Sequence, residues 1–83
     1  MKERAEATFG GMPAWLLADY LAGLGGRRTG DALVEGEGWA ATLVRGEKHL
    51  DGLSIARVTV TIEGPAADRV MRSLREKAMR GGG

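Results

Sequence analysis

The most constraining feature of the sequence is a strict alternation of apolar and polar residues late in the chain. Residues 57–62 read Arg-Val-Thr-Val-Thr-Ile. Side chains alternate between the two faces of a strand, so Val58, Val60 and Ile62 share one face. The run predicts a strand with one buried and one wet face, which is typical of an antiparallel sheet covered by helices on one side.

Two other segments have the same period of two. Residues 4–9 read Arg-Ala-Glu-Ala-Thr-Phe, and residues 39–44 read Trp-Ala-Ala-Thr-Leu-Val. Each places its apolar residues on one face, which predicts two more half-buried strands.

Two glycine-containing segments indicate connections between strands. Gly30-Asp31 lies between residues 27–29 and 32–35, and this arrangement predicts a tight hairpin. Residues 46–52 are charged and begin and end with glycine, so we expect a loop there.

The first helix is predicted over residues 14–24, directly after Pro13. Proline is favoured at the first helical position, and Gly25-Gly26 supplies the stop. Asp19 is the one charged residue in this run. A helix that is apolar all round is expected to be covered on more than one side.

A second helix is predicted after Gly64-Pro65. Its apolar stripe at helical spacing comprises Ala67, Val70, Met71, Leu74 and Ala78. The spacings Asp68–Arg72 and Arg72–Glu76 predict ion pairs between neighbouring turns.

The order of these elements predicts the fold class. Strand, helix, four strands and helix make an α+β two-layer sandwich, with a mainly antiparallel sheet and two helices. A chain of 83 residues is expected to form a single domain, residues 1–83. Its core is small, so oligomerisation would add burial.

Composition argues against several classes of protein. The formal net charge is +1, which is low for a nucleic-acid-binding domain. Cysteine is absent, so disulfides and thiolate chemistry are excluded. The sequence has no apolar run of membrane-spanning length and no signal-peptide core, which predicts a cytoplasmic protein without a membrane partner.

The sequence also lacks asparagine and glutamine, and arginine outnumbers lysine. Loss of thermolabile amides is a feature of thermophile proteins, so a thermophilic source is expected. A GC-rich genome would produce a similar bias.

Several short motifs resemble a domain of unknown function at the C-terminus of bacterial MoaD-related proteins. They are Phe9-Gly10, Ala14-Trp15-Leu16-Leu17, Leu24-Gly25-Gly26, Gly38-Trp39 and Arg80-Gly81-Gly82. The resemblance implies a fold like that of the TATA-binding protein, and a link to molybdenum-cofactor or sulfur-carrier biology. It does not imply DNA binding. The N-terminal ubiquitin-like domain of those proteins has no counterpart here, and the resemblance assigns no catalytic residue.

Five arginines are candidate binding residues for a phosphate-bearing ligand or an acidic partner. They are Arg27, Arg28, Arg69, Arg72 and Arg75. The alternative is a solvated surface, with the arginines of the last helix paired to Asp68 and Glu76.

Trp15, Tyr20 and Trp39 are candidate interface residues, because aromatic side chains are enriched at protein interfaces. The alternative places them in the core. Together with the all-round apolar first helix, they predict a homodimer or a complex with another protein, for which a MoaD-like carrier is one candidate partner.

The sequence offers no catalytic motif. His49 lies near Glu47 and Asp51, but no second histidine or cysteine completes a metal site. Ser54 and Ser73 have no nucleophile motif around them. We therefore expect no enzymatic activity, no metal and no cofactor.

The C-terminal Gly82 and Gly83 allow a different interpretation. Carrier proteins of the ubiquitin type end in Gly-Gly, because an unbranched tail must enter the site of an activating enzyme. Those carriers leave a strand, whereas this tail leaves a predicted helix, and glycine commonly ends helices. A helix stop is the favoured interpretation.

The leading functional hypothesis is thus a non-enzymatic accessory or interaction domain. Two alternatives stay open. One is a small-ligand-binding module that uses a sheet face or the basic helix, and the other is a carrier activated at Gly82-Gly83.

Overall fold

The computed structural model describes residues 3–81 of the chain. The elements follow the predicted order of strand, helix, four strands and helix, which confirms the α+β fold class. They are β1 (Arg4–Gly10), α1 (Ala14–Gly23), β2 (Arg27–Gly30), β3 (Leu33–Gly36), β4 (Trp39–Leu50), β5 (Leu53–Glu63) and α2 (Ala67–Gly81).

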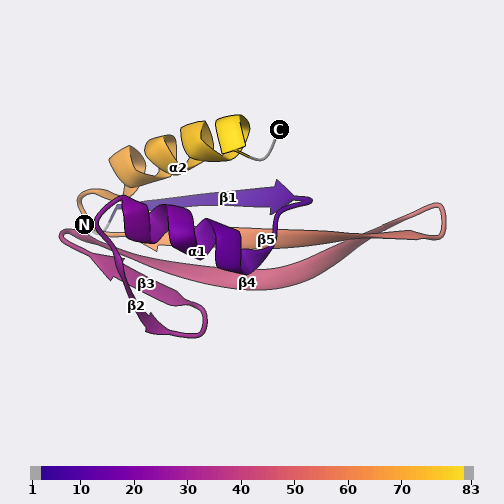
Figure 1. Cartoon of the computed structure of the whole chain (residues 1–83), viewed down its shortest axis with the longest axis horizontal. Helices are drawn as coiled ribbons and strands as arrows, with labels where there is room; N and C mark the ends of the chain where they lie inside the picture. The colour runs from indigo at the N-terminus through magenta and orange to yellow at the C-terminus, as the bar shows by residue number, and fades with distance from the viewer. Residues whose placement is uncertain (1–2, 82–83) are drawn as a thin grey trace.

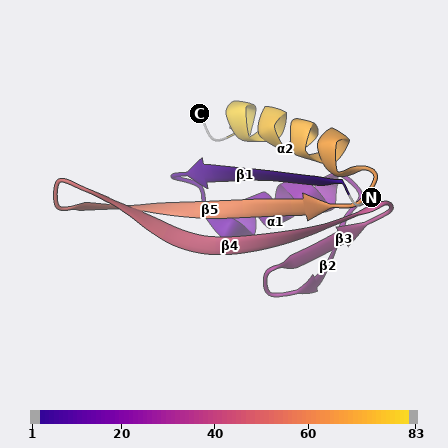
Figure 2. The same ribbon diagram turned by 180° about the vertical axis from the view of Figure 1, so that it is seen from behind.

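The strands form one antiparallel sheet in the order β1-β5-β4-β3-β2. Both helices lie on the same side of it, and the opposite side is open (Figures 1 and 2). Helix α2 packs mainly on β1 and β5, and α1 packs on β2, β3 and β4. Strands β1 and β2 are the edge strands of this order.

The core confirms the face predicted from the alternation in β5. Val58, Val60 and Ile62 are buried, and the alternating residues Arg57, Thr59 and Thr61 are half-buried on the other face. Leu17 and Leu21 of α1 belong to the same buried cluster and cover this face of the sheet. The predicted stripe of α2 is confirmed as well, since Ala67, Val70, Met71 and Leu74 are buried and Ala78 packs against them.

The structure corrects the prediction of a loop over residues 46–52. Strand β4 continues to Leu50, and β5 begins at Leu53, so only two residues form the turn. Asp51 has φ 48° and Gly52 has φ 81°. Positive φ at both central residues is the requirement of a type I′ turn, the tight hairpin connection that Asp-Gly favours.

The prolines precede the helices and do not occupy their first positions. Pro13 is the N-cap of α1, with extended backbone; α1 begins at Ala14, as predicted, and ends at Gly23, one residue earlier than predicted. Helix α2 begins at Ala67, two residues after Pro65. Neither predicted ion pair of α2 forms within the described residues, because Arg72 lies beyond pairing distance of both acidic neighbours.

Candidate interaction surface

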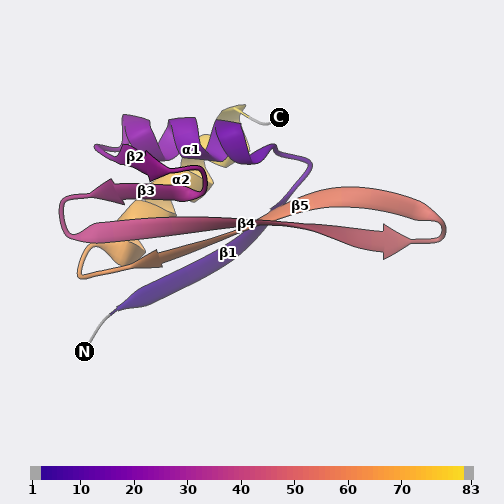
Figure 3. The ribbon, with the colours of Figure 1, turned by 90° about the horizontal axis from the view of Figure 1, so that it is seen from below.

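The β4–β5 hairpin extends well beyond the rest of the sheet. Pairing with β1 ends at Arg57, and pairing with β3 ends at Thr42. Residues 46–56, which we call the arm, therefore form a two-stranded ribbon. It accounts for much of the 41 Å length of the molecule (Figures 1 and 3). The backbone amide of Gly11 donates to the carbonyl of Ala56 at 3.1 Å and anchors the base of the arm.

The arm exposes aliphatic side chains on one face. Leu50 and Leu53 are opposite one another in the register, and Ile55 is opposite Lys48. All three lie on the face that continues the open side of the sheet, because their positions alternate with the buried series of each strand. Leu50 is 50% exposed and Leu53 is 66% exposed. An isolated two-stranded ribbon is marginally stable in water, so this surface is one that a partner would stabilise.

The open face over β1 and β5 has a different character. The Thr8 and Thr59 hydroxyls are 3.0 Å apart, and the Thr61 hydroxyl donates to the Glu6 carboxylate at 3.2 Å. The Arg4 guanidinium also donates to Glu6, at 3.2 Å. Cross-strand pairs of this kind satisfy one another and leave the surface polar. The apolar part of the open face is therefore concentrated toward the arm.

The three candidate aromatic residues occupy different environments. Trp15 is 59% exposed on α1, and it lines a hollow with Arg45 and Glu47 at the base of the arm. Tyr20 is half-buried. Trp39 is only 6% exposed and packs in the core. The structure thus places Trp15 next to the arm and places Trp39 among the core residues, the alternative noted for it above.

The five candidate arginines do not form one cluster. Arg27 and Arg28 lie on the β2 edge, whereas Arg69, Arg72 and Arg75 are exposed on α2 near the opposite edge. Arg28 forms an ion pair with Asp19 of α1, and it also donates to the carbonyl of Trp15 at 3.3 Å.

His49 lies on the helix-side face of the arm. Its Nε2 is 3.7 Å from a Glu47 carboxylate oxygen, and the Ser54 hydroxyl donates to the same carboxylate at 2.9 Å. Within residues 3–81, no three His, Cys, Asp or Glu side chains are grouped in a way that could hold a metal ion. The same residues include no helix that combines the length and hydropathy needed to cross a membrane.

The fold and these surfaces define a small α+β protein with a protruding two-stranded arm. A family model described as archaeal MoaD-like protein matches residues 5–83, nearly the whole chain. The chain therefore belongs to the archaeal MoaD-like protein family. A search of curated proteins found no match.

The family match confirms part of the resemblance found in the sequence. The relation to MoaD is shown, but the matching family is an archaeal one. Nothing in the match supports the more specific assignment to the C-terminal domain of bacterial MoaD-related proteins.

Proposed function

We propose that the protein is a non-enzymatic interaction domain in molybdenum-cofactor or sulfur-carrier biology, and that it acts as a homodimer joined through the arm. The observation that carries the proposal is the exposed face of Leu50, Leu53 and Ile55 on a ribbon that pairs with no third strand within residues 3–81. The biological setting is supported by membership of the MoaD-like family.

A second copy of the chain fits this surface. On the aliphatic face of the arm the charged side chains are those of Lys48 and Arg57, and Asp51 lies in the turn at the tip. A two-fold contact between antiparallel arms places the tip of one arm, with Asp51, near the base of the other, with Arg57. It also buries six half-exposed aliphatic side chains, at roughly 1 kcal/mol each. These terms favour self-association over an arm left in water.

Light scattering at micromolar concentration tests the proposal. The wild-type chain should have twice its 8.8 kDa mass. The double variant Leu50→Thr/Leu53→Thr should be monomeric, because threonine keeps the strand preference but removes the aliphatic surface. Met79→Gln is the matched control, since Met79 is 81% exposed on α2, away from the arm.

A monomeric wild-type chain would overturn the proposal, as would a dimer that survives the double variant. Circular dichroism of the double variant should retain the wild-type spectrum, and its thermal unfolding should remain cooperative although the stabilisation by dimerisation is lost. Loss of the dimer with a folded core then assigns the interface to the arm.

A second candidate function is a carrier activated at its C-terminus. The observation in its favour is that the MoaD-like match extends through Gly82 and Gly83. Both glycines lie outside the described residues, and the last described element is helix α2. Intact-mass analysis of the protein from its native host distinguishes a carrier from a helix stop.

A further inference from the structure

The edge strand β1 and helix α2 flank a shallow, open groove at the side of the sheet opposite β2. One hollow, of about 550 Å³, is lined by Ala7, Phe9, Met12, Arg75 and Met79 among others. A second hollow, of about 390 Å³, continues along β1 past Ala5 and Met71. Arg75 and Met79 line both, so the two hollows form one groove along the edge strand.

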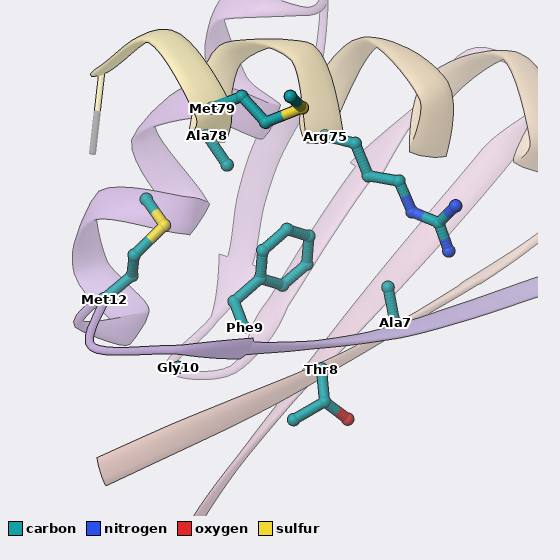
Figure 4. Close-up of a pocket in the computed structure, with 8 residues that line it drawn as sticks. All are labelled: Ala7, Thr8, Phe9, Gly10, Met12, Arg75, Ala78 and Met79. Atoms are coloured by element: carbon teal, nitrogen blue, oxygen red, sulfur yellow. The ribbon is translucent and has the colours of Figure 1, made fainter. Parts of the chain in front are cut away.

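The groove exists because strand β1 has short side chains on its helix-facing side. Ala5, Ala7 and Phe9 point toward α2, and the two alanines are too short to fill the distance between strand and helix. Figure 4 shows Ala7 and Phe9 directed to α2 and Thr8 directed away from it. On its outer side, β1 has no strand partner among the described residues. The groove therefore lies beside a strand edge whose backbone groups are available for pairing.

The larger of the two hollows has a positively charged side chain in its lining. Arg75 is the charged residue that lines the larger hollow, and it has no ion-pair partner among residues 3–81. The smaller hollow also contains Asp68, Arg72 and Glu76, so its charges are mixed. Arginine binds carboxylates through two parallel hydrogen bonds. The larger hollow thus combines an apolar floor with a cation at its rim.

We propose that this groove binds an extended acidic segment of a partner protein, which adds to β1 as a further strand. Side chains of such a segment point toward the groove at every second position. One apolar side chain would occupy the hollow between Phe9 and Met79, and an aspartate or glutamate two residues away would meet Arg75. Main-chain pairing with β1 supplies affinity, and the two side chains supply selectivity.

A second copy of the chain fits the groove poorly. Arg75 lines both hollows and so lies near the middle of β1. Antiparallel pairing of two β1 strands about a two-fold axis would bring the two Arg75 side chains close together. Like charges in contact oppose such a complex, whereas an acidic segment neutralises the charge. Met79 can pack against a side chain of the partner segment, because the flexible methionine side chain adapts to partners of different shape.

The probe is a blocked peptide of sequence Thr-Leu-Thr-Glu-Thr-Val-Thr, in which Leu, Glu and Val share one face. We expect amide shifts in the NMR spectrum of the full chain at residues 4–10 of β1 and 75–79 of α2. Replacing the peptide's Glu by Gln should weaken binding about tenfold, and so should Arg75→Gln in the protein. Their effects should not add, because both remove the same contact.

Arg69→Gln is the matched control, since Arg69 is exposed on α2 but does not line the groove. A peptide N-methylated at alternate amides should lose binding, because it cannot pair with β1. The proposal is overturned if no peptide binds, if the Glu and Gln peptides bind equally, or if the shifts lie elsewhere. It is also overturned if β1 amides shift with protein concentration alone, which would show self-pairing.

This site is separate from the arm. The variant Leu50→Thr/Leu53→Thr should bind the peptide with wild-type affinity, and Arg75→Gln should keep the dimer. Failure of one proposal therefore leaves the other intact.

Discussion

The indole ring of Trp39 packs against the α-carbon of Gly36 and occupies the place that a β-carbon of this residue would need. The two residues are cross-strand partners at the turn between β3 and β4. A methyl group on Gly36 would overlap the ring, and the ring is held in the core. Gly36→Ala should therefore lower the free energy of unfolding by about 1–3 kcal/mol, as overpacking does in other cores. Urea denaturation followed by tryptophan fluorescence measures the change.

Gly46→Ala is the control for this substitution. Gly46 also lies in strand β4, but a methyl group there would meet nothing within 4 Å. Its unfolding free energy should stay within about 0.5 kcal/mol of the wild type. Equal losses in the two variants would contradict this explanation, because the loss at Gly36 would then not depend on the indole ring.

The ion pair between Arg28 and Asp19 should contribute little to stability, although it links β2 to α1. Both side chains are about half exposed, so solvent screens their attraction. A double-mutant cycle with Arg28→Ala and Asp19→Ala should give a coupling energy below about 1 kcal/mol, and the coupling should decrease with added salt. A coupling that is insensitive to salt would contradict this.

Strands β1, β4 and β5 and helix α2 could be predicted from the sequence because their apolar periods are clear, whereas α1, which is apolar all round, was predicted from the proline before it and the glycines after it. Val58, Val60 and Ile62 repeat every second residue, and the α2 stripe repeats at helical spacing. The arm could not be predicted in the same way, because residues 46–52 have no alternating apolar face. Asp51-Gly52 was the available signal, since this pair favours a two-residue hairpin turn.

The surfaces were harder to predict than the fold. Trp39 and Trp15 are alike in the sequence, yet one lies in the core and the other beside the arm. Which of them is exposed depends on how α1 and β4 pack, and a single residue does not encode that. The arginines of α2 were candidate binding residues, but the groove at Arg75 depends on α2 lying along β1.

The turn of the arm should control local but not global stability. Asp51 has φ 48°, which a β-branched residue adopts only at a cost of about 1–2 kcal/mol. Asp51→Val should speed amide hydrogen exchange in residues 46–56 and weaken the dimer, while core amides of β5 keep their protection. Asp51→Asn should preserve both, because Asn-Gly forms the same turn. Equal exchange in the two variants would contradict the role of the turn.

A cavity in the core should destabilise the whole domain. Leu74 of α2 is fully buried with Leu17 and Ile62 in the same cluster. Leu74→Ala should lower the free energy of unfolding by about 2–5 kcal/mol, measured by urea denaturation. Met79→Ala, on the exposed side of the same helix, should change it by less than about 0.5 kcal/mol. A small loss at Leu74 would mean that the two layers pack less tightly than described.

The C-terminal glycines should behave as a helix stop. Helix α2 extends to Gly81, and glycines directly after a helix commonly end it. A carrier tail instead needs a free, unbranched end that an activating enzyme can adenylate, and the MoaD-like match includes Gly82 and Gly83. Intact-mass analysis of the protein from its native host separates the two roles. We expect an unmodified terminus, and wild-type melting and dimerisation after deletion of Gly82 and Gly83. A terminal thiocarboxylate, or an isopeptide conjugate through Gly83, would instead identify a carrier.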